Sequence, residues 1–197
     1  VPFSRAVVGN LMRRIKRDKL GLPVLSTEDR KLILDSFAPV YRVGYNSRDD
    51  RIGRPAYIKM GALEVDVKDP VVFRRIAFTR IGYKVHLQLV YTAFFPARTS
   101  AGTLDIFAGN LDGLILRITL NDRGQPIVYD SIHPCGCYHL FFPASPWQLK
   151  PEIENAIFGE PPLAPTAGPI PNSGQRVRLL LKPGTHYLAG VELTDKT

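Results

Sequence analysis

Two histidines and both cysteines of this chain stand at every second position in one short stretch, Ser131 to Pro143. The stretch reads SIHPCGCYHLFFP and contains His133, Cys135, Cys137 and His139. Thiolate and imidazole groups bind zinc and other transition metals, and they also act as nucleophiles and proton carriers. We therefore begin with the chemistry that these four side chains could perform.

The spacing limits how a metal could bind here. In a regular strand all four side chains would share one face, but His133 and His139 would lie about 20 Å apart. One zinc ion, with ligand bonds of about 2.0–2.3 Å, cannot collect ligands across that span. Pro134 and Gly136 allow the strand to end, because proline lacks a ladder donor and glycine accepts a sharp turn. We expect a strand-to-loop bend in which two or three of the four side chains converge.

The same geometry applies to a disulfide between Cys135 and Cys137. Residues i and i+2 of an extended strand have Cβ atoms about 7 Å apart, whereas a disulfide needs about 3.8 Å. The bond can close only if Gly136 bends the chain sharply. Such a small ring would be strained and easily reduced, and it would remove little chain entropy, so it favours a redox role over a structural one.

Four interpretations of this stretch follow from its residue types. The first is a metal site, with zinc or another transition metal held by some of His133, Cys135, Cys137 and His139, together with His186 near the C-terminus. The second, weighted equally, is a structural role with reduced cysteines packed as small apolar groups. A thiol redox pair and a cysteine nucleophile with a histidine base rank below these two. The spacing H-x-C-x-C-x-H differs from known zinc-finger patterns.

Two acids are candidates for a supporting role. Asp130 stands three residues before His133 and could orient an imidazole, as carboxylates often do beside metal-bound histidines. Asp112 lies in a glycine-rich segment between two expected strands and could carry a proton, although an Asp-Gly pair more commonly forms a turn. The chain contains no glycine-rich phosphate loop, no G-x-S-x-G sequence and no H-E-x-x-H sequence. Nucleotide-dependent and serine-hydrolase functions are correspondingly disfavoured.

Periodicity predicts the elements that must position these residues. Strands are expected at 62–67 and 83–91, where apolar and polar residues alternate, and two hairpins are expected over 113–132 and 176–193. We find no alternation of strands and helices that would support a parallel sheet. The predicted fold is therefore β-rich α+β, an antiparallel sandwich or partly closed barrel with one or two N-terminal helices packed outside.

The N-terminal part has helical periodicity. Residues 1–20 place apolar side chains at helical spacing opposite their cations, and a second helix is expected to begin at Ser26 or Thr27 and to stop at Pro39. Three interpretations of residues 1–20 remain open: a helix docked on its own domain, a membrane-surface segment, and a phosphate-binding arm. We divide the chain into a basic amphipathic segment, 1–25, and a single β-rich domain, 26–197.

Prolines are concentrated near the C-terminal end. Residues 143–175 contain eight of the seventeen prolines of the chain. A segment so poor in backbone donors cannot form a central strand, so we expect a long extended excursion over the surface. Excursions of this length often act as lids or as arms that bind a partner.

Charge and composition narrow the class of protein. Of the net charge of +8, residues 1–20 contribute +5, so the rest of the chain is nearly balanced. This distribution argues against nucleic acid as the partner but leaves an anionic membrane surface open for residues 1–20. No apolar run is long enough to span a membrane. Paired cysteines favour the periplasm or cell envelope over the cytoplasm.

The leading hypothesis is a metal-binding protein, most simply a zinc protein. It would be a metal-dependent hydrolase if a coordination position stays open for water, with Asp130 or Asp112 orienting a ligand or moving a proton. The alternative is a non-catalytic binding module of the cell envelope with a membrane-proximal N-terminus, which binds a small molecule or a protein. A third hypothesis is thiol-disulfide redox chemistry at Cys135 and Cys137.

Overall fold

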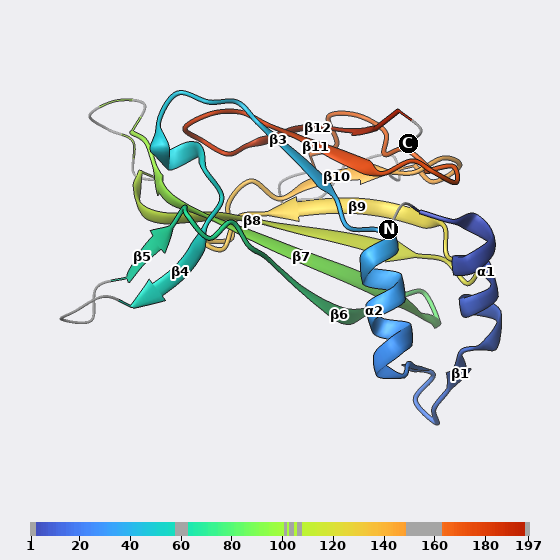
Figure 1. Ribbon diagram of the computed structural model, residues 1–197. Helices are drawn as coiled ribbons and strands as arrows, with labels where there is room; N and C mark the ends of the chain where they lie inside the picture. The colour runs from blue at the N-terminus through green and yellow to red at the C-terminus, as the bar shows by residue number, and fades with distance from the viewer. Residues whose placement is uncertain are drawn as a thin grey trace.

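Two β-sheets lie face to face in the computed structural model, which describes residues 3–57, 63–100, 102, 105, 108–148 and 163–195 (Figure 1). The larger sheet is antiparallel and consists, from edge to edge, of β10 (Leu140–Pro143), β9 (Pro126–Ile132), β8 (Gly109–Leu120), β7 (Lys84–Arg98) and β6 (Val72–Ile81). The smaller sheet consists of β12 (Leu188–Leu193), β11 (Val177–Leu181) and β3 (Val40–Val43). Within the smaller sheet β11 runs antiparallel to β12 and parallel to β3.

The remaining elements flank these two sheets. They are α1 (Arg5–Arg14), β1 (Lys16–Arg17), β2 (Pro23–Val24), α2 (Thr27–Ser36), the 3-10 turn η1 (Arg48–Asp50), β4 (Arg54–Tyr57) and β5 (Leu63–Asp66). Both helices lie at one end of the sandwich, on the right in Figure 1, while η1 and the β4-β5 hairpin lie at the other end. The predicted β-rich α+β sandwich is confirmed, and among the described residues no sheet closes into a barrel.

The core fills the space between the sheets. Leu89 of β7 and Leu116 of β8 are fully buried, as is Leu179 of the facing β11. They belong to one apolar cluster that also includes Ile33 of α2. Burial of a leucine-sized side chain stabilises a fold by about 1.5–3 kcal/mol, so this shared cluster holds the two layers together.

The first helix is docked on the sheets. Val8 and Leu11, on its apolar side, are about 1% exposed and belong to the common core. The β8-β9 turn packs against this side at Gly124, where φ is +73° and an added Cβ would lie 2.4 Å from the Val8 side chain. The docked helix, one of the three interpretations of residues 1–20, is what the structure shows for Arg5–Arg14, whereas Lys16–Arg17 form β1 and pair with β2. The apolar side of α1 is therefore covered by its own protein.

Local patterns in the sequence correctly predicted the second helix and both hairpins. Ser26 caps α2 and forms a reciprocal capping box with Asp29, and the helix ends before Pro39. The predicted hairpin over 113–132 is β8-β9, and the hairpin over 176–193 is β11-β12. These predictions are confirmed because alternation and turn residues act over short distances.

The proline-rich excursion is described at its two ends. Pro143 ends β10, and the returning chain pairs with the same region through bridges at Leu163 and Gly168. Residues 149–162 of the predicted excursion lie outside the described residues. Among the described helices, none has the length and apolar character needed to cross a membrane.

Candidate functional site

The cysteine and histidine stretch forms the turn between β9 and β10. The strand ends at Ile132 and the next begins at Leu140, so residues 133–139 form the predicted strand-to-loop bend. The His133 N–H donates to the Cys137 carbonyl at 3.0 Å, and the Gly136 N–H donates to the His133 carbonyl at 2.8 Å. Gly136 has a φ of +92°, which glycine adopts at no steric cost. Residues 133–139 therefore form the sharp bend that Pro134 and Gly136 predict.

The two histidines of the stretch point to different surroundings. The His133 side chain is 2% exposed, whereas the His139 side chain is 38% exposed. His139 directly precedes Leu140, which pairs with Ser131, so the two histidines lie on the two legs of the turn. One bend thus supplies one side chain to each of two separate clusters.

His133 belongs to a buried group that we call the inner cluster: Asp50, Asp112, His133 and His186. His133 Nδ1 lies 3.0 Å from Asp112 Oδ1, and His186 Nδ1 lies 2.7 Å from Asp112 Oδ2. Because a carboxylate can only accept hydrogen bonds, both imidazoles donate through Nδ1. Asp112 thereby joins two histidines that are far apart in the sequence.

The charge of Asp112 is stabilised by these donors. Burial by itself raises the pKa of the Asp112 carboxyl, but the hydrogen bonds from His133 and His186 outweigh burial and hold this pKa well below its ordinary value. An ionised Asp112 therefore keeps a proton on Nδ1 of each imidazole. Among the described residues, His133 Nε2 and His186 Nε2 are buried without a hydrogen-bond partner.

Asp50 lies beside the other ring nitrogen of His186, Nε2. Its Oδ1 lies 3.3 Å from His186 Nε2 and accepts the Gly184 N–H at 2.5 Å, while Oδ2 accepts the N–H groups of Asn46 and Ser47. Burial raises the pKa of the Asp50 carboxyl, and these backbone donors outweigh it, so the pKa is lowered. His186 also stacks on Phe95 at 3.8 Å between ring centroids. The β11-β12 turn is therefore held rigidly beside Asp112.

The two cysteines are reduced and contact each other. Cys135 is exposed and Cys137 is half-buried. The Cys137 N–H donates to the Cys135 sulfur at 3.4 Å. The pKa of the Cys137 thiol is raised, first by its hydrogen bond to the Cys135 side chain and then by burial. The turn therefore brings the two thiols side by side.

The thiols and the inner cluster border one cavity of about 130 Å³. Its walls include Asp112, His133 and both cysteines, and they also include Arg98 and Tyr138. Arg98 forms an ion pair with Asp105 at 2.8 Å and donates to the Tyr138 hydroxyl at 3.1 Å. Its guanidinium favours the thiolate form of Cys137, which opposes the larger effects that raise the pKa of that thiol.

Backbone strain is concentrated around this cavity. Among the described residues, the non-glycine residues with positive φ are Leu111, Tyr138 and His186, at +64°, +54° and +50°. Leu111 precedes Asp112, Tyr138 follows Cys137, and His186 belongs to the inner cluster. Such conformations are costly in side chains with a Cβ and tend to cluster where a site imposes its geometry. This clustering makes the region our candidate functional site.

A second group, the outer cluster, contains Arg117, Asp130 and His139. The Arg117 Nε–H donates to Asp130 Oδ1 at 2.5 Å, and Arg117 Nη2 lies 2.8 Å from His139 Nε2. Because arginine can only donate, His139 Nε2 is the acceptor, and its 3.2 Å approach to Asp130 is a contact without a shared proton. Asp130, expected to orient an imidazole near His133, instead lies beside His139.

The predicted metal ligands do not assemble as one set. His133 and His186 meet at Asp112, the two cysteines meet in the turn, and His139 lies in the outer cluster. Within the described parts of the chain, no three histidine, cysteine, aspartate or glutamate side chains converge in a geometry that could hold a metal ion.

Three residues of these clusters escaped the sequence analysis as site residues. Asp50, Arg98 and Arg117 were not named there, because none of them stands at the spacing of a known catalytic or metal-binding motif. The Ser47-x-x-Asp50 spacing does predict the capping box found at η1, but it does not predict contact with His186.

No protein-family model matches this chain, no curated protein matches it, and no solved structure matches it. Function must therefore be inferred from the chemistry of the site itself.

Proposed function

We propose that this protein carries out thiol-disulfide exchange, with Cys135 as the attacking cysteine and Cys137 as the resolving cysteine. The observation that carries the proposal is the Cys135-Gly136-Cys137 bend, in which Gly136 has a φ of +92° and the Cys137 N–H donates to the Cys135 sulfur at 3.4 Å. The bend brings the two thiols together, as an exchange between an attacking and a resolving cysteine requires. Cys135 is also the more exposed of the two and can reach a disulfide in another molecule.

The reaction transfers two electrons. The Cys135 thiolate attacks one sulfur of a partner disulfide, forming a mixed disulfide and releasing the other partner sulfur as a thiolate. The Cys137 thiol loses its proton and attacks the Cys135 sulfur, which breaks the mixed disulfide and releases the second partner thiolate. The partner is reduced to a dithiol and the protein is left with a Cys135–Cys137 disulfide. The reverse sequence donates that disulfide to a reduced partner.

The turn determines which direction is favoured. A disulfide across Cys135-Gly136-Cys137 closes a very small ring, and small strained rings are more oxidising than structural disulfides. We expect a reduction potential above about −200 mV, so the oxidised protein would donate its disulfide. The positive φ of Gly136 supplies the sharp bend that ring closure needs.

The inner cluster fixes the position of the β9-β10 turn. The His133 backbone closes the turn through its bonds to Gly136 and Cys137, and its ring ties the turn to the buried Asp112. His133 is therefore a positioning residue that holds the two sulfurs together.

The test is the redox titration of the whole chain in glutathione buffers, read by alkylation and intact mass. We expect a single two-electron transition that disappears in Cys135→Ser and in Cys137→Ser. Cys137→Ser should accumulate a mixed disulfide with glutathione, whereas Cys135→Ser should accumulate much less. Failure to form the intramolecular disulfide across the accessible potential range would overturn the proposal.

Metal binding, with zinc or another transition metal, is the second candidate function, and one observation favours it. His133 donates through Nδ1 to the Asp112 carboxylate and has a buried Nε2 without a hydrogen-bond partner, which is the arrangement usual for metal-bound histidines. In this case elemental analysis of protein prepared without chelators should find metal. The cysteines should then resist alkylation until a chelator is added. A redox pair would instead require a reductant, and a chelator would have no effect.

A further inference from the structure

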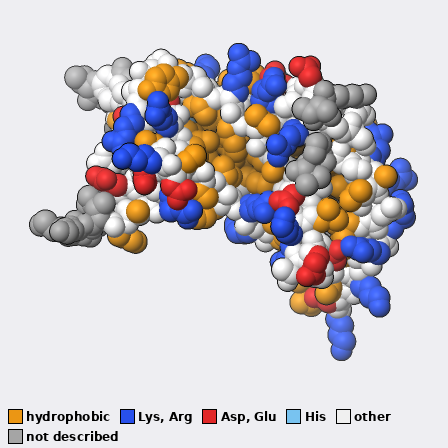
Figure 2. Space-filling model, viewed as in Figure 1, with side chains coloured by type: hydrophobic (Ala, Val, Ile, Leu, Met, Phe, Trp, Pro, Cys, Tyr) orange, Lys and Arg blue, Asp and Glu red, His pale blue; other side chains and the backbone are white. Residues whose placement is uncertain are grey.

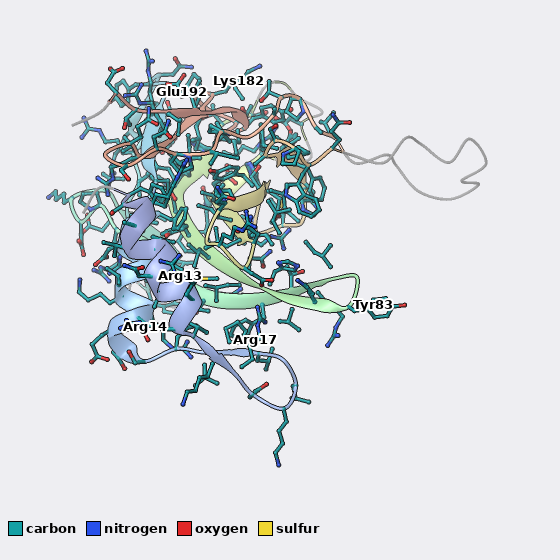
Figure 3. All side chains as sticks on the ribbon, turned by 90° about the vertical axis from the view of Figure 1, so that its right-hand side faces the viewer. Arg13, Arg14, Arg17, Tyr83, Lys182 and Glu192 are labelled. Atoms are coloured by element: carbon teal, nitrogen blue, oxygen red, sulfur yellow. The ribbon has the colours of Figure 1, made fainter. Side chains whose placement is uncertain are left out.

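Two turns at the helical end of the molecule carry exposed apolar tips. In the turn between β1 and β2, the N–H groups of Leu20 and Leu22 donate to the Asp18 carboxylate at 2.8 and 2.9 Å, which leaves Leu20 73% exposed at the tip. In the turn between β6 and β7, Tyr83 is fully exposed. Figure 3 shows Tyr83 projecting from its hairpin into solvent. Large exposed apolar side chains that lie close together are typical of surfaces that bind a partner or a membrane.

The two turns form one unit. The Arg17 guanidinium donates to the Gly21 carbonyl at 2.7 Å and to the Val85 carbonyl at 2.8 Å, one in each turn region. Asp122 accepts from Arg17 and from Lys84, both at 3.0 Å. A depression of about 250 Å³ lies between the turns, and its walls include Leu20, Tyr83, Arg17, Arg80 and Lys84. The tips are thus rigidly placed on either side of a cationic hollow.

Cations surround this hollow. We call the surface the cationic corner; it contains Arg13, Arg14, Lys16, Arg17, Lys19, Leu20, Arg80, Tyr83 and Lys84. Figure 2 shows lysine and arginine side chains gathered at the lower right, and Figure 3 labels Arg13, Arg14 and Arg17 on this side of the molecule. Lys16, Lys19 and Arg80 form no ion pair within the described residues. The corner therefore carries an excess of positive charge.

We infer that the cationic corner docks on an anionic lipid membrane. Lipid phosphates complement the hollow and its surrounding cations, and the interfacial zone beneath them receives Leu20 and Tyr83, since tyrosine favours that zone. This mode differs from insertion of an amphipathic helix, because Val8 and Leu11 of α1 are already buried in the protein core. The corner lies at the opposite end of the sandwich from the β9-β10 turn, so docking leaves the cysteines facing away from the lipid (Figure 1).

The test is sedimentation of the whole chain with phosphatidylcholine vesicles that contain about one-third phosphatidylserine. We expect binding at low salt, at least a tenfold weaker affinity at 0.5 M salt, and no binding to pure phosphatidylcholine. Leu20→Ser with Tyr83→Ser should weaken binding at least tenfold, as should Lys19→Glu with Arg80→Glu. The matched control is Tyr57→Ser with Lys68→Glu, an exposed aromatic residue and an exposed lysine in and beside the β4-β5 hairpin, which should bind like the wild type.

Three outcomes would overturn the inference: no binding to the anionic vesicles, equal weakening by the control variant, or full binding by the Leu20 and Tyr83 variant. Tighter binding to nucleic acid than to vesicles, lost in the same charge variants, would assign the corner to a nucleic acid instead. If the double variant does not fold, Tyr83→Ser alone keeps the test decisive, because the fully exposed Tyr83 makes no contribution to the core. Its binding should then fall several-fold while its thermal midpoint stays unchanged.

Discussion

The inner and outer clusters contain the same kinds of groups in different surroundings. In the inner cluster, Asp112 is 8% exposed and uses both carboxylate oxygens to accept from two imidazoles. In the outer cluster, Asp130 uses one oxygen, Oδ1, in its contacts with Arg117 and His139. His186 is fully buried, whereas the His139 side chain is 38% exposed. The inner cluster is a buried hydrogen-bond network that connects strand ends. The outer cluster is an ion pair beside a partly exposed histidine.

This difference between the two clusters shows that closeness in the sequence does not predict which side chains share a cluster. His133 and His139 stand six positions apart, yet they serve different carboxylates. His133 and His186 stand far apart, yet they share one. An unpaired group in the inner cluster would be costly, because a buried polar atom without a partner loses its hydration without compensation. In the outer cluster Asp130 is also buried, but Arg117 and His139 are 29% and 38% exposed, so water reaches that side of the cluster.

The largest expected effect comes from changing each carboxylate to an amide. Asp112→Asn should lower the free energy of unfolding by about 3 kcal/mol, because the new amide N–H₂ faces one of the two imidazole donors and the negative charge is lost. Asp130→Asn should cost about 1 kcal/mol, since Oδ1 remains as an acceptor. Urea denaturation measures both. Equal costs would mean that the two clusters are equivalent structural networks.

The second effect is the pH dependence of stability. The pKa of Asp112 is lower in the folded protein than in the unfolded chain, where it is about 4. Its contribution is therefore present at neutral pH and is lost as the pH falls below about 4 toward the depressed native value. Denaturation at pH 7 and at pH 3 should show a smaller difference between the wild type and Asp112→Asn at the lower pH. A constant difference would contradict the assigned charge state.

The third effect separates the histidines by their influence on the thiols. His133→Ala removes the tether between the turn and Asp112, so the equilibrium constant for closing the Cys135–Cys137 disulfide should fall about tenfold, or ~30 mV. His139→Ala should change it less than about twofold, because its contacts lie in the outer cluster. Glutathione equilibration followed by alkylation measures both variants. A larger response to His139→Ala would move the functional site to the outer cluster.

The smallest effect belongs to the ion pair of the outer cluster. Arg117→Gln should cost about 1 kcal/mol at low salt, because Asp130 is buried but Arg117 is 29% exposed, so water can replace part of the lost guanidinium. Most of that cost should disappear at 1 M salt, where exposed charges are screened. The effect of Asp112→Asn should persist at the same salt concentration, since Asp112 is buried and salt screens buried groups much less than exposed ones. Thermal unfolding at two salt concentrations distinguishes the two responses.

Local patterns in the sequence determined much of the fold. The alternation in 83–91 became part of β7, the glycine-containing loop at 121–125 became the β8-β9 turn, and Ser26 capped α2. Each of these signals acts over a few residues, through side-chain alternation or through a hydrogen bond to the nearby backbone. The same reasoning correctly predicted that the strand ends before the Cys135–Cys137 turn, because Pro134 and Gly136 constrain their own backbone.

Tertiary structure alone decided which of the named residues act together. The sequence analysis named Asp112, His133 and His186, but their contacts join positions 21 and 74 residues apart. Such pairings depend on how the β9-β10 and β11-β12 turns meet at one end of the sandwich, and no local pattern encodes that meeting. Asp50 was missed for the same reason, since its spacing to Ser47 reports a local cap. Its position beside His186 exists only once the two sheets have packed and brought these strand ends together around a shared carboxylate.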